Sequence, residues 1–580
     1  MATLPAALRP RGFSLEFKVL VFAAAIITLG FSVIYPIVLL FINSFVTTNP
    51  PLPAEYGLDS WRFALSDRGM LIALWNSMVV TFLRQGISFP VAILLAWLIA
   101  RTNLPGAKLL EFGFWIAFFL PVVSVTQAWI LLAHPSAGLL NQTLEYLPFV
   151  DEGPLNIYSL WGIIWVHLAT NSIAIKVMLL TPAFRNMDAA LEDASRLCGA
   201  SSLGTLRRVT VPVMAPIMMT LLLLSILRAF QSVEIEVLLG LPIRYFVFGS
   251  KIFDLVQNEP PDFGAATAMG IIILAAIIPL IIGQYYMTSR RNYTTLSGKY
   301  QAQVNDLRKW KWPVFGFVLF LVFLMTIFPM IFLVMGSFMK FSGFFYDVPG
   351  GPWTTLHWTR ILTDGTFLLS MRNTFVMALG AATLSTLFFT VLAYIIVRMR
   401  SRLVPILDFL TWVPYVLPGI VLILAWLWIL LGTGGIFHPL YGTIFALILV
   451  SGLSGITLGV QIVKSNLRQI GAELEEASSI VGAPWLVTLI RVVVPLLAPA
   501  MVVVWVLNFV AAAGTAILPA LLASSSSKTL ALLQFEQVTS GRLEAGSIVG
   551  IFVVLLTVGV AIIARVLGFR VGLGSGTPRN

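Results

Sequence analysis

Two stretches of the sequence are near copies of each other, and they decide the fold. Residues 191–216 read LEDASRLCGASSLGTLRRVTVPVMAP, and residues 474–499 read LEEASSIVGAPWLVTLIRVVVPLLAP. Fifteen of the 26 aligned positions are identical. Each stretch predicts a short helix that begins with acidic residues, then a glycine suited to a positive φ or a close approach, and a second amphipathic segment. A proline follows that we expect in the first turn of an apolar helix.

The repeat extends over most of the chain. Upstream of the two stretches, matching residues such as Asn76 and Asn373, or Arg101 and Arg398, lie 297 positions apart. Within the two stretches the offset is 283, so the first copy carries 14 extra residues. We expect these residues in the loop 133–156, because loops tolerate insertions at little cost. The chain is therefore predicted to consist of two homologous halves.

The composition places most of the chain in lipid. Only 11% of the residues are charged and 58% are hydrophobic, with a mean hydropathy of +0.94, whereas a soluble domain keeps about a quarter of its residues charged. A membrane-spanning helix needs about 20 mostly apolar residues. We predict an all-α integral membrane protein with about twelve such helices, six in each half. The predicted windows are 17–42, 75–100, 108–132, 157–180, 212–239 and 264–287, then 313–338, 371–397, 404–431, 440–463, 495–521 and 545–568.

Basic residues collect between alternate windows and set the expected orientation. Residues 288–312 contain six Lys or Arg residues and one acid, Asp306. Because cytoplasmic loops carry such an excess, we expect both termini on the cytoplasmic side. The two halves then have the same orientation about a pseudo-two-fold axis along the membrane normal. The expected division is a first half 1–287, a basic linker 288–312 and a second half 313–580.

Several classes of site are absent from the sequence. The single cysteine, Cys198, excludes an internal disulfide and a cysteine metal site, and the four histidines have no ligand spacing. No phosphate-binding loop is present, because Gly298-Lys299 is followed by Tyr300 and no glycine lies five residues earlier. The basic residues lie between apolar windows rather than in a surface stripe, so we expect the lipid bilayer and not nucleic acid as their partner.

The paired stretches resemble the EAA loop of ABC importer permeases. The family pattern is Glu-Ala-Ala, three residues, Gly, nine residues, Ile, any residue, Leu-Pro. The second copy follows it with Glu476-Ala477-Ser478, Gly482 and Val494-Pro495, and the first with Asp193-Ala194-Ser195, Gly199 and Val211-Pro212. Serine replaces the second alanine in both copies, and aspartate replaces the glutamate in the first, which hints that the two loops are not equivalent. The candidate coupling residues are Glu192, Asp193, Ala194, Ser195, Gly199 and Pro212, with Glu475, Glu476, Ala477, Ser478, Gly482 and Pro495.

The resemblance implies a fused two-copy permease in a bacterial cytoplasmic membrane. In that family the loop forms a coupling helix in a groove of a cytoplasmic ATPase, so two ATPase copies are expected beneath this chain and a solute-binding protein above it. ATP and magnesium would be bound by the ATPase, and no cofactor or metal is expected here. The chain would be a transport component rather than an enzyme. It looks most like tandem permeases for ferric iron, with relatives for thiamine, aminoethylphosphonate and polyamines.

Polar residues in the fifth window are candidates for a solute pathway. Arg228, Gln231, Glu234 and Glu236 lie in this window, and their counterparts in the second half carry no charge. Ionisable residues at membrane depth are costly and are functional candidates for that reason. The alternative is that Arg228 pairs with a neighbouring helix while both glutamates contact the outer interface or the binding protein.

A secondary transporter with six plus six helices is the main rival, because it shares the parallel repeat. Such a protein is expected to carry a Gly-x-x-x-Asp-Arg loop after its second span. Here that loop reads RTNLPGAK, at residues 101–108, and does not fit. A channel or scaffold would leave the duplicated loop unexplained.

Overall fold

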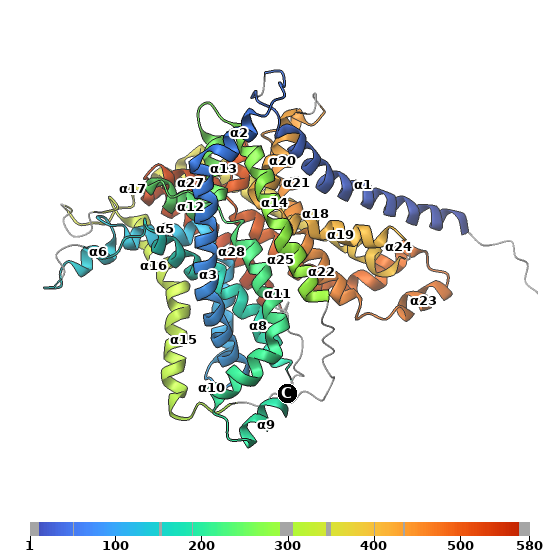
Figure 1. Ribbon diagram of the computed structural model, residues 1–580, viewed down its shortest axis with the longest axis horizontal. Coiled ribbons are helices and arrows are strands. Elements are labelled where there is room, and N and C mark those ends of the chain that lie inside the picture. Colours follow the sequence, from blue (N-terminus) through green and yellow to red (C-terminus); the bar gives the residue numbers. More distant parts are fainter. Residues whose placement is uncertain are drawn as a thin grey trace, which may run out of the picture.

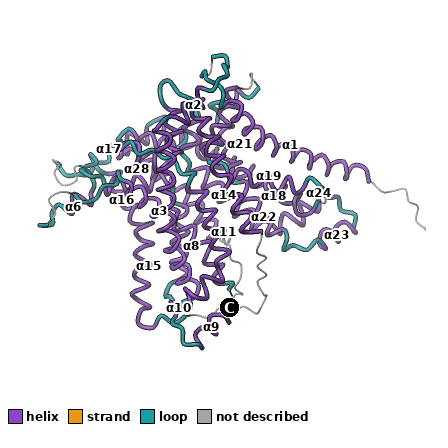
Figure 2. The backbone as a smooth tube through the Cα atoms, in the orientation of Figure 1, coloured by secondary structure: helices purple, strands orange, loops and turns teal. Residues whose placement is uncertain are grey.

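The computed structural model describes a helical protein. It covers residues 11–567 except 50–51, 150–152, 188–189, 290–304, 344–347, 349, 400 and 433–435. Within these residues all regular backbone is helical, and the only sheet-like pairs are isolated bridges (Figure 2). The predicted all-α class is confirmed.

The first half begins with a long helix and ends with another (Figure 1). Its elements are α1 (Arg11–Asn43), α2 (Asp59–Ser66), α3 (Arg68–Arg101), α4 (Ala107–Phe119), α5 (Val122–Ala133), α6 (Leu139–Leu144), α7 (Leu160–His167), the π turn η1 (Leu168–Ser172), α8 (Ile173–Arg185), α9 (Ala190–Leu197), α10 (Ser202–Thr205), the π turn η2 (Leu206–Thr210), α11 (Val211–Ala229), α12 (Glu234–Gly240), η3 (Leu241–Ile243), α13 (Phe248–Gln257) and α14 (Phe263–Ser289).

The second half repeats this order. Its elements are η4 (Arg308–Trp310), α15 (Lys311–Met325), α16 (Ile327–Phe338), α17 (Leu356–Thr363), α18 (Gly365–Arg398), α19 (Val404–Val416), α20 (Gly419–Gly432), η5 (His438–Leu440), α21 (Ile444–Ser454), α22 (Ile456–Leu467), α23 (Glu473–Ile480), α24 (Trp485–Thr488), the π turn η6 (Leu489–Val493), α25 (Val494–Gly514), α26 (Ile517–Leu522), α27 (Leu530–Thr539) and α28 (Leu543–Val566).

The internal repeat is visible element by element. Helices α3 and α18 both have 34 residues, and α4 and α19 both have 13. Helix α6 lies in the loop 133–156, where the extra residues of the first copy were expected. The corresponding loop of the second half, between α20 and α21, is much shorter, and its described part contains only η5. The predicted position of the insertion is confirmed.

The predicted membrane windows coincide with helices. Among the described residues, eight helices or helical runs are long and apolar enough to cross a membrane, and three sharply bent pairs raise the number to eleven. The remaining window, 264–287, falls on α14, whose apolar stretch Phe263–Ala276 is too short to be counted with them.

Three predicted windows are bent pairs of helices. Window 440–463 is the pair α21 and α22, bent by 53°. Window 108–132 is the pair α4 and α5, bent by 96°, and window 404–431 is the pair α19 and α20, bent by 106°. The prediction of a single helix in each of these three windows is wrong. In the two sharper bends the break comes at Leu120 and Leu417, whose ψ angles of 130° and 128° are extended. Each of these leucines precedes a proline, and a proline ring disfavours helical backbone in the residue before it.

The fifth predicted window, 212–239, is also interrupted. Helix α11 ends at Ala229, and Glu234 begins the separate helix α12. The side chains of Gln231 and Ser232 in the break form hydrogen bonds with Tyr415 and Glu236. The equivalent window of the second half, 495–521, is interrupted at the same place, between α25 and α26, so the break is a feature of the repeat.

The two halves exchange their first helices. Helix α1 packs against α19 and α20 of the second half, and α15 and α16 pack against α4 and α5 of the first half. The largest hydrophobic cluster draws on both halves and includes the repeat-related pair Trp129 and Trp426. The halves therefore share a core.

Candidate functional site

Each duplicated loop folds as a short helix, a left-handed glycine and a second helix. In the first loop α9 leads to Gly199 and α10, and in the second α23 leads to Gly482 and α24. The φ angles of the two glycines are +84° and +83°. A Cβ atom at either position would meet nothing within 4 Å. The positive φ predicted from the sequence is confirmed, and it alone requires glycine here, since the left-handed conformation costs other residues about 1–2 kcal/mol.

A serine–threonine hydrogen bond closes each loop. The Ser195 Oγ lies 3.0 Å from the Thr205 Oγ1, and the Ser478 Oγ lies 2.9 Å from the Thr488 Oγ1. Both bonds join the helix before the glycine to the helix after it. This contact gives the serine that replaces the second alanine of the family pattern a structural role in both copies.

The first loop is fastened to the bundle by a buried ion pair. The Glu192 Oε2 accepts hydrogen bonds from Arg101 Nη2 at 2.9 Å and Arg101 Nε at 3.3 Å. Its other oxygen accepts a 2.8 Å bond from the Thr210 hydroxyl. The two side chains of the ion pair are 0% and 2% exposed. Arg101 is the last residue of α3, so Glu192 joins the start of α9 to the end of a membrane-length helix.

The second loop has the equivalent ion pair with a different surrounding. The Arg398 Nε donates to the Glu475 Oε1 at 2.7 Å, and the Tyr394 hydroxyl donates to the Glu475 Oε2 at 2.8 Å. The Trp485 Nε1 donates in turn to the Tyr394 oxygen at 2.9 Å. Both side chains of this ion pair are 16% exposed. The two loops are thus anchored at the same positions, but the second anchor is less completely enclosed.

The anchoring divides the predicted coupling residues into two groups. Glu192 and Glu475 face the bundle, whereas Glu476, Ala194 and Ala477 are exposed, and Asp193 is half-buried. Three apolar side chains at the ends of the two helices face solvent: Leu197, Ile480 and Val481 are 90%, 84% and 82% exposed. Each loop therefore presents a short helix with an exposed apolar end on a rigid internal attachment.

The two prolines lie in the first turns of apolar helices, as predicted, but the helical backbone does not begin there. Pro212 and Pro495 occupy the first turns of α11 and α25, but helical backbone already runs from Ser202 and Trp485 through the π turns η2 and η6. A proline inside a helix cannot donate to the carbonyl four residues earlier. The π turn before each proline accommodates the lost bond. The second segment of each loop is consequently continuous with the next membrane-length helix.

Three of the four predicted pathway residues contact the opposite half. The guanidinium of Arg228 lies 5.2 Å from the ring centre of Tyr415, and the Gln231 Nε2 donates to the Tyr415 carbonyl at 2.9 Å. The Glu234 Oε1 accepts a 2.9 Å hydrogen bond from the Ala516 backbone N–H. These residues therefore lie where the two halves meet.

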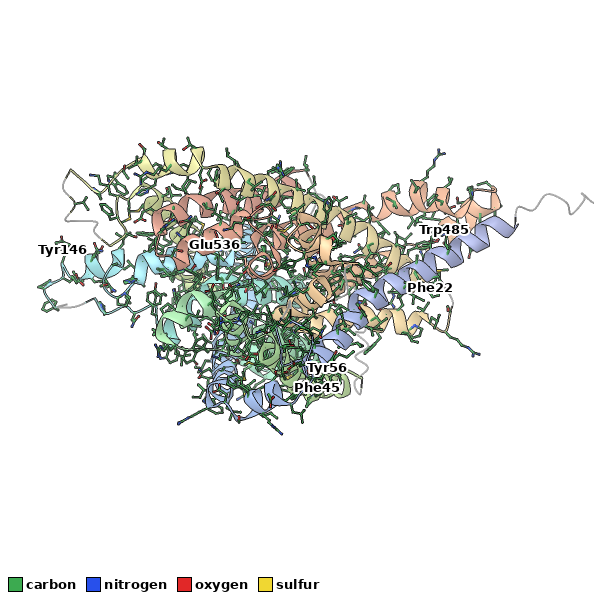
Figure 3. All side chains as sticks on the ribbon, turned by 90° about the horizontal axis from the view of Figure 1, so that it is seen from above. Phe22, Phe45, Tyr56, Tyr146, Trp485 and Glu536 are labelled. Carbon is green, nitrogen blue, oxygen red and sulfur yellow. The ribbon has the colours of Figure 1, made fainter. Side chains whose placement is uncertain are left out.

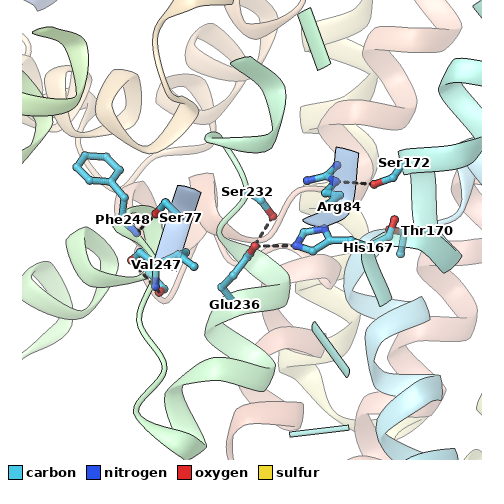
Figure 4. A network of polar contacts seen from close by, with 10 residues as sticks. Ser77, Arg84, His167, Thr170, Ser172, Ser232, Glu236, Val247 and Phe248 are labelled. Atoms are coloured by element: carbon cyan, nitrogen blue, oxygen red, sulfur yellow. Dashed lines mark hydrogen bonds and ion pairs between the residues drawn. The ribbon is translucent and has the colours of Figure 1, made fainter. Parts of the chain in front are cut away.

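The fourth residue, Glu236, lies inside the first half (Figure 4). Its Oε1 is 2.7 Å from the His167 Nε2, and its Oε2 accepts a 2.8 Å hydrogen bond from the Ser232 hydroxyl. The contact with His167 joins α12 to α7. The expectation that Glu236 lies at an outer interface is wrong, because both carboxylate oxygens are satisfied by buried or half-buried polar groups of the same half.

Two further buried cations accompany this network. The Arg84 Nε donates to the Ser172 Oγ at 2.6 Å, and the Lys176 Nζ donates to the Ser88 Oγ at 2.9 Å and the Ser172 carbonyl at 2.8 Å. They surround η1, where Thr170 has non-helical φ and ψ of −85° and −123°. Lys176 is missing from the sequence candidates, although a charged residue inside the window 157–180 is the signal that identifies it.

No metal centre is evident in the part of the chain that the structure describes. No group of three His, Cys, Asp or Glu side chains there is placed to hold an ion.

The fold and the paired loops define a multi-pass membrane transport component built from two homologous helical bundles. The chain belongs to the family of binding-protein-dependent transport system inner membrane components, whose model matches residues 88–293 and 390–573. The two matched segments fall in the two halves, and the resemblance drawn from the paired loops is confirmed.

Individual relatives are similar to the chain at modest identity. A ferric transport system permease protein, FbpB, of Actinobacillus pleuropneumoniae is 26% identical over 453 residues, which cover 77% of this chain and 64% of that protein. A ferric transport system permease of Haemophilus influenzae is 28% identical over 347 residues, 59% of this chain and 53% of that protein. The chain thus spans about half to two thirds of the length of these two relatives.

Another relative and a solved structure each match about half of the chain. The maltose/maltodextrin transport system permease protein MalG of Escherichia coli strain K12 is 25% identical over 292 residues, 48% of this chain and 93% of that protein. A solved structure of a bacterial alginate ABC transporter in complex with a pentasaccharide-bound periplasmic protein aligns with a TM-score of 0.40 and 18% identity, covering 49% of this chain and 98% of that one.

Proposed function

We propose that this chain is the permease subunit of an ABC importer, driven by two copies of a separate ATPase and supplied by a solute-binding protein on the outer face. The observation that carries the proposal is the pair of equivalent loops, each presenting an exposed helix, α9 or α23, on an internal ion pair. The family membership supports the dependence on a binding protein. ATP and magnesium belong to the ATPase, and the loop end of the bundle and both termini face the cytoplasm.

In this mechanism the two ion pairs transmit the movement of the ATPase to the membrane helices. A coupling helix that moves with the ATPase pulls on the end of α3 or α18 through Glu192–Arg101 or Glu475–Arg398. The same movement reaches α11 or α25 directly, since the backbone is helical from the second loop segment onward. Closure of the two ATPase copies would therefore move two long helices in each half, which is the step that alternating access requires.

The solute pathway is proposed to run between the halves. Arg228, Gln231 and Glu234 support this placement because their contacts cross from the first half to the second. Glu236 does not contact the second half, but it fixes the position of α12, which carries Glu234, by holding α12 to α7. The charged side chains in these contacts, Arg228 and Glu234, both belong to the first half, so the pathway is proposed to be chemically asymmetric.

Ferric iron is the proposed substrate, on the basis of the two ferric permease relatives. Uptake of radioactive ferric iron by cells that express the chain with its ATPase and binding protein tests this. Thiamine, aminoethylphosphonate and a polyamine serve as competing solutes. Saturable iron uptake that none of these three solutes inhibits supports ferric iron as the substrate. Uptake of one of the three solutes in place of iron would identify that solute as the substrate instead.

Co-purification of the ATPase tests the coupling role of the loops. The wild-type chain, extracted in mild detergent, should bring down a nucleotide-binding subunit. The combined variant Gly199→Val and Gly482→Val should lose it while inserting normally into the membrane, because a β-branched residue is strained at positive φ. Gly541→Val is the matched control, since Gly541 has a φ of +73° and open space around its Cβ position but lies outside both loops.

The variant Glu476→Ala tests the exposed face of the second loop. We expect it to abolish transport without loss of membrane insertion, because the carboxylate faces solvent and is available to a partner. Normal transport by this variant and by Gly482→Val would contradict the assignment. A wild-type chain that purifies alone and catalyses ion-coupled uptake without ATP would establish a secondary transporter instead.

A further inference from the structure

The 14-residue insertion of the first half forms an arm that the second half lacks. We define the arm as residues 134–149 together with 153–156, between α5 and α7. Because α8 leads from α7 back to the coupling helix α9, the arm lies at the opposite end of these spans from α9 (Figure 1). Tyr146 marks its far edge in the view from above, on the opposite side of the molecule from Trp485 (Figure 3).

One buried asparagine fixes the base of the arm. Asn141 is fully buried, and its Nδ2 donates to the carbonyls of His134 at 2.9 Å and Leu155 at 2.7 Å. Its Oδ1 accepts a 2.9 Å hydrogen bond from the Leu155 backbone N–H. The amide therefore ties the two ends of the arm together, since His134 follows α5 and Leu155 precedes α7.

Two more hydrogen bonds hold the outer part of the arm. The Gln142 Nε2 donates to the Gly343 carbonyl of the second half at 2.9 Å. The Glu145 Oε1 accepts a bond from the Gly153 backbone N–H at 3.1 Å. A loop with these internal and cross-half bonds is preorganised, and a preorganised surface loses little conformational entropy when it binds a partner.

The end of the arm is apolar and exposed. Tyr146, Leu147 and Phe149 are 70%, 50% and 93% exposed. The sequence from 134 to 159 contains three acids, Glu145, Asp151 and Glu152, and no lysine or arginine. A cluster of exposed apolar side chains beside charged residues is typical of an interaction site.

We propose that this arm is a docking element for the solute-binding protein, which meets it with an apolar patch bordered by basic residues. The inference rests on the proposed function, which places the end of the bundle opposite α9 outside the membrane. The charge of the segment matches a protein surface with basic residues, because residues 134–159 contain three acids and no lysine or arginine. Aromatic side chains held in a fixed position are the usual anchors of a protein interface.

The binding constant of the binding protein tests the proposal. The probe is the purified solute-binding protein that stimulates ATP hydrolysis by the wild-type permease–ATPase complex in lipid nanodiscs. Two variants are compared with wild type: the triple variant Tyr146→Ser, Leu147→Ser and Phe149→Ser, and a deletion of residues 139–152, which gives the loop the length of its counterpart. Ile436→Ser is the matched control, because Ile436 is 80% exposed in the corresponding loop of the second half.

We expect both arm variants to bind the probe at least tenfold more weakly, while ATPase co-purification and unstimulated hydrolysis stay at the wild-type level. Ile436→Ser should change the affinity less than twofold. Wild-type affinity in the triple variant would overturn the proposal. Loss of the ATPase from the wild-type preparation would instead contradict the proposed function itself.

A second measurement distinguishes a membrane role. In the variant Phe149→Cys on a Cys198→Ser background, an environment-sensitive fluorophore attached to the introduced thiol reports the surroundings of this position. We expect the binding protein to shift its emission and brominated phosphatidylglycerol nanodiscs to leave it unquenched. Strong quenching by brominated lipid without the binding protein would assign the arm to the membrane surface and overturn the proposal.

Discussion

At the scale of single residues, the two halves contain the same ion pair, but the pair is more deeply buried in the first half than in the second. Arg101–Glu192 and Arg398–Glu475 occupy equivalent positions, but the first pair is sealed and the second is partly open to solvent. Removing one partner of a buried ion pair leaves an uncompensated charge in a poorly solvated place, whereas water can reach a partly exposed one. The consequences of breaking the two anchors should therefore differ.

Glu192→Ala is expected to lower the free energy of unfolding by about 3–5 kcal/mol, because it leaves Arg101 buried without its carboxylate. Glu475→Ala is expected to cost about 1–3 kcal/mol, since Arg398 keeps hydrogen bonds to the carbonyls of Ile470 and Leu467. Chemical unfolding in detergent micelles measures both. Glu476→Ala, in the same helix as Glu475 but exposed, should leave stability unchanged. Equal losses from all three variants would contradict the anchoring account.

The sequence predicted the backbone of these loops better than their contacts. The glycine spacing predicted a positive φ at Gly199 and Gly482, because that requirement is local and repeated. The partner of Glu192 could not be predicted in the same way. Arg101 lies 91 positions earlier, and only the packing of α3 against its neighbours brings its guanidinium to the loop. A repeat identifies residues with a shared role but not the atoms that they touch.

At the scale of elements, the main surprise is the number of breaks within apolar segments. Hydropathy measures length and composition, so it cannot distinguish one straight helix from two helices at a right angle. The signal was nevertheless present for α4–α5 and α19–α20, where Leu120-Pro121 and Leu417-Pro418 match across the repeat. No proline signal of this kind marks the breaks before α12 and α26, which lie at equivalent positions of the two halves.

The attachment of α12 to α7 through Glu236 and His167 is open to a direct test. Glu236→Leu should cost about 1–3 kcal/mol, because it leaves the His167 ring nitrogen and the Ser232 hydroxyl without their partner. Glu236→Gln should retain most of the stability, since an amide of the same shape still forms hydrogen bonds. Thermal unfolding and hydrogen exchange of residues 234–240 report the difference. Equal protection of these residues in both variants would show that the contact does not hold α12.

At the scale of the whole molecule, the halves are interlocked rather than placed side by side. Each half lends its first helix or helix pair to the other: α1 packs on α19 and α20, and α15 and α16 pack on α4 and α5. A half expressed alone would expose to lipid the faces that these contacts cover. The fused chain guarantees that both partners are present in equal amount.

Cutting the chain between residues 289 and 305 should therefore leave a complex that assembles when both parts are expressed together. We expect the two parts to co-purify and to restore transport with the ATPase and binding protein. Either part expressed alone should accumulate poorly and elute as an aggregate in size-exclusion chromatography. A single half that is monodisperse and as thermally stable as the intact chain would show that the exchanged helices contribute little.

The exchange of helices between the halves also means that α1 is synthesised long before the second-half helices that it packs against. Helix α1 is made roughly 360 residues before α19, the first of the two helices that it packs against most extensively in the second half. At a ribosome speed of about 5–20 residues per second, α1 waits about 20–70 s in the bilayer before that surface exists. During this interval the face of α1 that α19 and α20 later cover is exposed to lipid, membrane proteases and insertion factors. Biogenesis of the protein should for this reason be most vulnerable while its second half is still on the ribosome.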